Sequence, residues 1–201
     1  SYPYGLEREG SMAKSEHSTK FHGLAIGMSI IPAIIFVLLL TQLGQVAQGE
    51  ILAFTLPWIP SLSIEFGLWL DGLSLLFALI ITLVGALVTI YASAYLSGHP
   101  QRNRFILIIT LFMFAMLGVV LSRNLITLFV FWELTSITSF LLIGFYHEQE
   151  TSRQAALQAL LVTGGGGLML LVGFILLGIT GGSFDIGSLS SSAADLKASP
   201  L

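Results

Sequence analysis

Cysteine is absent from the sequence, and charged residues are scarce. Without cysteine the chain can form no disulfide, no thiolate metal site and no cysteine nucleophile. Only 9% of the 201 residues are charged, whereas soluble domains contain about 25%. The basic residues form no cluster, which excludes the positive surface typical of nucleic-acid-binding proteins.

Catalytic and metal-binding patterns are also missing. The four histidines are His17, His22, His99 and His147, and no two have the spacing of metal ligands on one helix face. The sequence shows no Ser-His-Asp arrangement and no nucleotide-binding fingerprint. We therefore expect no metal, no cofactor and no enzymatic activity.

Long apolar runs dominate what is present, and 55% of the residues are hydrophobic. A membrane crossing needs about 20 apolar residues, and lipid offers no partners to the backbone, so each crossing must be a helix. The predicted fold is an all-α integral membrane protein, a bundle of about five transmembrane helices. The predicted helices are Phe21–Leu43, Gly67–Leu96, Phe105–Leu121, Leu125–Tyr146 and Ala155–Ile179.

The runs divide the chain into three parts. Residues 1–20 are a polar N-terminal tail, residues 21–180 form the membrane domain, and residues 181–201 are a Gly/Ser-rich loop or truncated tail. Basic residues favour the inner side of a membrane. With the N-terminus inside, Arg123 and Lys197 lie outside, and six lie inside: Arg8, Lys14, Lys20, Arg102, Arg104 and Arg153.

Glu133 lies within the fourth apolar run, eight residues after Leu125, which corresponds to about 12 Å along a helix. A charged side chain at the centre of a membrane helix costs about 2.5–3.5 kcal/mol on insertion scales, and such acids mark ion or proton pathways. Asp71 is the other acid that touches an apolar run. The alternative for Glu133 is a neutral carboxyl that bonds a neighbouring helix and has only a structural role.

Polar residues near these two acids also have two interpretations. Ser136 lies three residues after Glu133 and shares its helix face, so with Thr135 it predicts a polar, hydrated path; the alternative is packing and hydrogen bonding to its own helix. Asp71 begins the sequence Asp-Gly-Leu-Ser at the start of a helix, where an acid caps free N–H groups.

The glycine run 164–167 lacks the Lys-Ser/Thr of a phosphate loop. It predicts close packing of this helix against a neighbouring helix.

Two stretches resemble a known family. LPWIPSLSIEFGLWLDGLSLLFALIITLVGALVTIYASAYL and FWELTSITSFLLIGFYHE are similar to the large A-type subunit of Mrp-type multisubunit Na⁺/H⁺ antiporters. Proton-pumping subunits of respiratory complex I share parts of them. The resemblance runs from about Ile51 to Ile179, and the motif Phe-Trp-Glu-Leu-Thr-Ser is closer to the Mrp type.

The resemblance implies a partial antiporter-like subunit that conducts protons in Na⁺/H⁺ antiport. Glu133 matches the family's glutamate that pairs with a lysine on a later helix, and Asp71 matches the acid of the Asp-Gly-Leu-Ser motif. Implied partners are the lipid bilayer, other subunits of a multisubunit antiporter complex, protons and a monovalent cation, Na⁺. The implied location is the plasma membrane, a prokaryotic-type inner membrane that the chain crosses several times.

Two other functions remain open at this stage. One is a proton-pumping membrane subunit of a complex I-type NADH:quinone oxidoreductase. The other is a scaffold subunit that does not transport. The partner lysine of the family lies beyond the residues of this chain, so we do not expect the isolated chain to transport ions.

Overall fold

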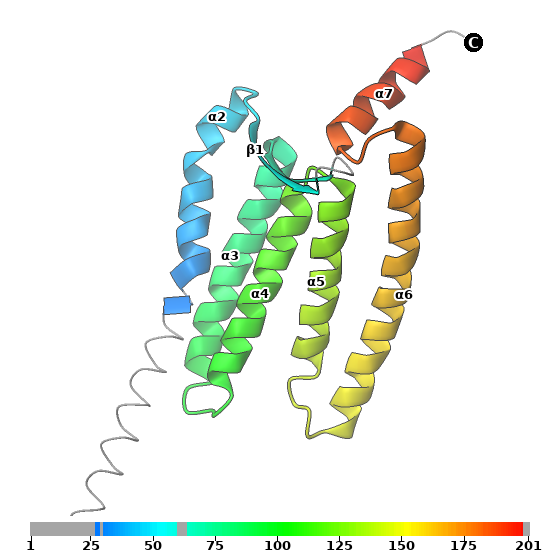
Figure 1. The fold of residues 1–201 in the computed structure, drawn as a ribbon. Coiled ribbons are helices and arrows are strands. Elements are labelled where there is room, and N and C mark those ends of the chain that lie inside the picture. The colour runs from blue at the N-terminus through cyan, green and yellow to red at the C-terminus, as the bar shows by residue number, and fades with distance from the viewer. Residues whose placement is uncertain (1–26, 29, 60–63, 199–201) are drawn as a thin grey trace, which may run out of the picture.

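The computed structural model describes residues 27–28, 30–59 and 64–198. This part contains five helices long and apolar enough to cross a membrane: Ile30–Ala47, α3 (Gly72–Tyr95), α4 (Arg102–Leu121), α5 (Leu125–Ile143) and α6 (Glu150–Gly181). The first ends in the short helix α2 (Leu43–Ala47). Neighbouring helices run antiparallel and stand side by side in chain order (Figure 1). The predicted five-helix bundle is confirmed; residues 1–26, with the predicted tail and the start of the first helix, lie outside the described residues.

The basic residues of the described part separate as predicted between the two ends of the bundle. Arg102, Arg104 and Arg153 lie at the end where α3 meets α4 and α5 meets α6. Arg123 lies at the opposite end, in the turn between α4 and α5. We call the first end the inner end and the second the outer end, following the predicted orientation.

The predicted second helix begins too early. Gly67–Leu70 belong to strand β2 (Ile64–Leu70), which pairs antiparallel with β1 (Leu52–Ile59) across the outer end (Figure 1). These residues are apolar, but their backbone has partners outside a helix. Gly67 pairs with Thr55 of β1, and the Gly67 carbonyl accepts from the Arg123 N–H at 2.9 Å. These bonds satisfy the backbone without a helix.

Helix α3 begins where a reciprocal cap forms. The Ser74 N–H donates to Asp71 Oδ1 at 2.8 Å, and the Asp71 N–H donates to Ser74 Oγ at 2.8 Å. This capping box satisfies free N–H groups of the first turn and confirms the capping interpretation of Asp71. Helix α5 begins with a cap in one direction only, in which Asn124 Oδ1 accepts from the Ile126 N–H at 2.9 Å. It ends at Ile143, three residues before the predicted Tyr146.

Residues 181–201, predicted as a Gly/Ser-rich loop or truncated tail, contain a helix that was not predicted, α7 (Ile186–Ala198). Gly182 ends α6 with a φ of 68°, a left-handed conformation that glycine adopts at little cost. Asp185 then accepts hydrogen bonds from the Ser188 N–H at 2.8 Å and the Ser188 hydroxyl at 2.9 Å. These bonds cap a new helix at the outer end (Figure 1).

Glycines set how closely the central helices approach. A Cβ atom on Gly118 of α4 would overlap the ring of Phe131 on α5. A Cβ atom on Gly85 of α3 would lie 2.7 Å from Sδ of Met113 on α4. Small residues at such points let membrane helices pack tightly, and this packing fixes the position of α5 and its acidic residue.

Candidate functional site

The side chain of Glu133 lies between α5 and α6. Its Oε1 atom is buried and has no hydrogen-bond partner among the described residues. A Cβ atom on Gly167 of α6 would overlap this oxygen. The carboxyl group therefore rests against the backbone of α6, at a position that only glycine leaves free.

This geometry weakens the structural interpretation of Glu133. A carboxyl retained for stability is expected to bond a neighbouring helix, yet no hydrogen bond or ion pair joins Glu133 to any residue in the described ranges. A buried polar atom without a partner costs about 1–3 kcal/mol. An acid of this kind within a membrane helix is a candidate for binding and releasing a proton.

The hydroxyls of Thr135 and Ser136 face a different space. Both line a groove of about 670 Å³ between α4, α5 and α6, together with Ser139 and Thr163. Thr135 Oγ1 donates to the Trp132 carbonyl at 2.6 Å, and Ser136 Oγ donates to the same carbonyl at 3.4 Å. These hydrogen bonds agree with the alternative interpretation, in which the hydroxyls bond the backbone of their own helix. Glu133 is not among the residues that line the groove.

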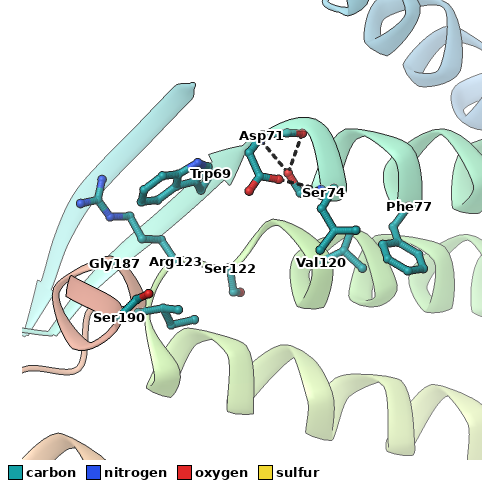
Figure 2. A pocket seen from close by; sticks show the side chains of 11 residues that line it. Trp69, Asp71, Ser74, Phe77, Val120, Ser122, Arg123, Gly187 and Ser190 are labelled. Carbon is teal, nitrogen blue, oxygen red and sulfur yellow. Dashed lines mark hydrogen bonds between the residues drawn. The ribbon is translucent and has the colours of Figure 1, made fainter. Parts of the chain in front are cut away.

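Asp71 lies at the outer end, far along the bundle from the middle of α5, so the structure does not bring the two predicted acids together. Asp71 lines a pocket of about 360 Å³ with Trp69, Ser74 and Arg123. Figure 2 shows this pocket, with the hydrogen bonds between Asp71 and Ser74 as dashed lines. The hydrogen bond from the Ser74 backbone N–H outweighs partial burial and holds the pKa of Asp71 below its ordinary value.

An ion pair at this outer end was not predicted from the sequence. Arg123 Nε lies 2.5 Å from Asp185 Oδ2, and Arg123 Cζ lies 4.6 Å from the ring centroid of Trp69. The Arg123 carbonyl accepts from the Ile186 N–H at 2.9 Å. Burial raises the pKa of Asp185, but the hydrogen bond and charge of Arg123, with two hydrogen bonds from Ser188, outweigh it and leave that pKa below its ordinary value. Arg123 thus joins the hairpin, the α4–α5 turn and the start of α7.

Two family descriptions match the sequence. Residues 57–106 match "NADH-Ubiquinone oxidoreductase (complex I), chain 5 N-terminus", and residues 122–200 match "NADH:quinone oxidoreductase/Mrp antiporter, TM". The A1 subunit of the Na⁺/H⁺ antiporter of Staphylococcus haemolyticus (strain JCSC1435) is 46% identical over 171 residues, which cover 85% of this chain and 21% of the relative. The chain is a homologue of the A-type subunits of Mrp Na⁺/H⁺ antiporters and belongs to the antiporter-like superfamily.

Other relatives agree with this assignment. The A1 subunit of the Na⁺/H⁺ antiporter of Staphylococcus aureus (strain N315) is 45% identical over 171 residues, which again cover 85% of this chain and 21% of the relative. The Mrp complex from Dietzia sp. DQ12-45-1b contains a chain with a TM-score of 0.65 and 30% identity, covering 85% of this chain and 20% of that one. A chain of the archaeal membrane-bound sulfane sulfur reductase shares the fold, with a TM-score of 0.73, 22% identity, and coverage of 85% and 35%.

The family resemblance predicted from the two sequence stretches is confirmed. The chain spans about a fifth of the length of the curated relatives it matches. Those relatives are subunits of transporters rather than enzymes, by their names.

Proposed function

We propose that this chain is part of a membrane subunit that conducts protons in cation/proton antiport, and that Glu133 binds and releases the transported proton. The observation that carries the proposal is the buried Oε1 atom of Glu133, within a membrane helix and without a partner among the described residues. A carboxylate accepts one proton at an oxygen and loses its charge, so each cycle of protonation removes and restores the cost of a charge in the membrane.

The relatives support the choice of ion and of partners. Their names specify Na⁺/H⁺ exchange, and one structural neighbour belongs to an Mrp complex. We therefore propose Na⁺ as the exchanged cation and other subunits of a multisubunit antiporter as lateral partners. The five helices are long and apolar enough to cross a membrane, and the relatives are bacterial, so we propose a plasma membrane of the prokaryotic inner-membrane type.

Three further residues are proposed to support Glu133. Asp71 supports it indirectly, because its cap fixes where α3 begins and α3 packs on α4. Ser136 and Thr135 line the groove next to the α5–α6 interface and give that groove its polar surface. We propose no direct proton transfer by any of the three.

A redox-driven pump is the second candidate, and the family descriptions that name NADH-quinone oxidoreductases favour it. The two candidates differ in what drives the proton. An antiporter responds to an added cation without any electron donor, whereas a redox pump responds to NADH and quinone. A scaffold subunit responds to neither.

The proposal is tested by Glu133→Gln in the full-length subunit within its complex. Exchange is measured in inverted membrane vesicles as the loss of a pH gradient after Na⁺ is added. We expect the rate per assembled complex to fall at least about 100-fold, the usual scale for removing a group that transfers protons. Glu148→Gln is the matched control, since Glu148 is an exposed acid in the turn after α5.

Three results are informative. Loss of exchange with normal assembly, together with a normal Glu148→Gln control, supports Glu133 as the proton-binding group. Normal exchange in Glu133→Gln overturns that role. Proton pumping that requires NADH and ignores Na⁺ replaces antiport with the second candidate.

A further inference from the structure

The contact between Glu133 and α6 falls on one glycine of a run of four. Gly167 is buried, and a Cβ atom there would overlap Glu133 Oε1 and lie 3.0 Å from the carboxyl carbon. The carboxyl group and the backbone of α6 thus share a space that a single methyl group would fill. The three heavy atoms nearest to such a Cβ atom all belong to Glu133.

The other three glycines of the run have no such neighbour. A Cβ atom on Gly164, Gly165 or Gly166 would meet nothing within 4 Å in the described part of the chain. The run lies inside a continuous helix from Glu150 to Gly181, so none of its glycines is needed there for a turn or a positive φ. Glycine within a helix lowers the stability of the helix by about 1 kcal/mol relative to alanine. Each glycine of the run therefore needs a structural or functional explanation.

We propose that Gly167 is a positioning residue, which holds the Glu133 carboxyl at its working place by having no side chain. This inference rests on the proposed function of Glu133 and adds the residue that sets the location of its carboxyl group. The close packing predicted for residues 164–167 is therefore specific: it occurs at one glycine, and its partner is the acidic side chain itself.

An alanine at this position has a defined consequence. The new methyl group would occupy the space of Oε1, so Glu133 must adopt another rotamer or α5 and α6 must separate. Displacing a reacting group by about 1 Å can cost about 100-fold in rate. We therefore expect Gly167→Ala to lower exchange by about 10- to 100-fold and to displace the pH profile of exchange.

The experiment compares two identical substitutions on one helix, in the full-length subunit within its complex. Gly167→Ala is tested against Gly165→Ala, with Gly173→Ala as a second control because its Cβ atom would also meet nothing within 4 Å. All three gain the same intrinsic helix propensity. The readouts are complex assembly, Na⁺-dependent exchange from pH 6 to pH 9, and the infrared carboxyl band that Glu133→Gln removes.

The inference predicts that Gly167→Ala moves the infrared band and the pH profile while at least one control leaves both unchanged. It also predicts a rescue. Glu133→Asp shortens the side chain by one methylene and withdraws the carboxyl group from α6, so Gly167→Ala should cost less than about threefold in that background. If Gly167→Ala blocks assembly, the same double variant should restore it.

The failures of the two proposals are distinguishable. If Gly167→Ala matches its controls in band position and pH profile, or blocks assembly without rescue by Glu133→Asp, the positioning role is wrong. In either case Glu133→Gln still decides the proposed function by itself. If Glu133→Gln exchanges normally while the band still moves in Gly167→Ala, the contact exists but does not serve transport, which also overturns the positioning role.

Discussion

Two regions of this chain treat charged groups in opposite ways. At the outer end, Asp71 bonds Ser74, and Asp185 bonds both Arg123 and Ser188. At the α5–α6 interface, the buried Oε1 atom of Glu133 lies against Gly167 and has no hydrogen-bond partner among the described residues. The carboxylates of the outer end have hydrogen-bond or ion-pair partners within the chain, whereas Glu133 has none among the described residues.

The difference separates two acids with structural bonds from the acid that we propose to bind a proton. A paired carboxyl gains stability from its partners and holds its charge, as the lowered pKa values of Asp71 and Asp185 indicate. A carboxyl with a buried, unpaired oxygen, as in the half-buried Glu133, lowers stability, and membrane proteins keep such groups where ions or protons pass. On this basis the outer end is a cap that fixes the helices, and Glu133 is the acid for which we propose a role in transport.

The largest effect outside the α5–α6 interface is expected for the Arg123 cluster. Arg123→Ala removes the ion pair with Asp185 and the contact with Trp69, and should lower the stability of the assembled complex by about 1–2 kcal/mol. Thermal unfolding of the purified complex measures this. Arg104→Ala is the control, because Arg104 is exposed and forms no ion pair within the described ranges.

The same cluster predicts a dependence on pH. The pKa of Asp185 is lowered in the folded state, so its contribution is complete above the unfolded value of about 3.9 and is lost as pH falls through the folded value. Asp185→Asn should therefore reduce the loss of stability below about pH 4. An acid profile identical to that of the unmodified complex would show that the pair contributes nothing.

A smaller effect is expected at Asp71. Asp71→Ala removes the cap of α3 and should cost about 1 kcal/mol, whereas Asp71→Asn keeps a capping oxygen and should cost little. Exchange per assembled complex should remain normal in Asp71→Asn. A loss of exchange in Asp71→Asn, with assembly intact, would place Asp71 in the proton path and remove its distinction from Glu133.

The smallest effects are expected for the hydroxyls in the groove. Thr135 and Ser136 donate to the carbonyl of Trp132 on their own helix, so Thr135→Val and Ser136→Ala leave no new buried group unpaired. Each should change exchange by less than about fivefold, equivalent to about 1 kcal/mol. A fall of 100-fold in either variant would show that the groove, rather than the α5–α6 interface, conducts the proton.

Hydropathy predicted the features that depend on neighbouring residues in the sequence. It found the five helices, and the Asp-Gly-Leu-Ser pattern found the cap at Asp71. It did not find strand β2, because Gly67–Leu70 continue the apolar run of the helix that follows, and their pairing with β1 leaves no mark on composition. It also missed α7, whose start depends on bonds that Asp185 makes.

The site was predicted only in part for the same reason. An acid within an apolar run identified Glu133, but its contact with Gly167 depends on how α5 and α6 pack, 34 residues apart in the sequence. The pair Arg123–Asp185 joins residues 62 positions apart. No periodicity connects such positions, so only the folded chain shows which charged groups have partners.

The most direct test of the account measures exchange per assembled complex in Glu133→Gln and Asp185→Asn side by side. The account predicts that Glu133→Gln assembles and unfolds normally but exchanges at least about 100-fold more slowly, while Asp185→Asn unfolds at a lower temperature and exchanges normally. Normal exchange in Glu133→Gln would contradict it, because the unpaired acid would then serve no transport step.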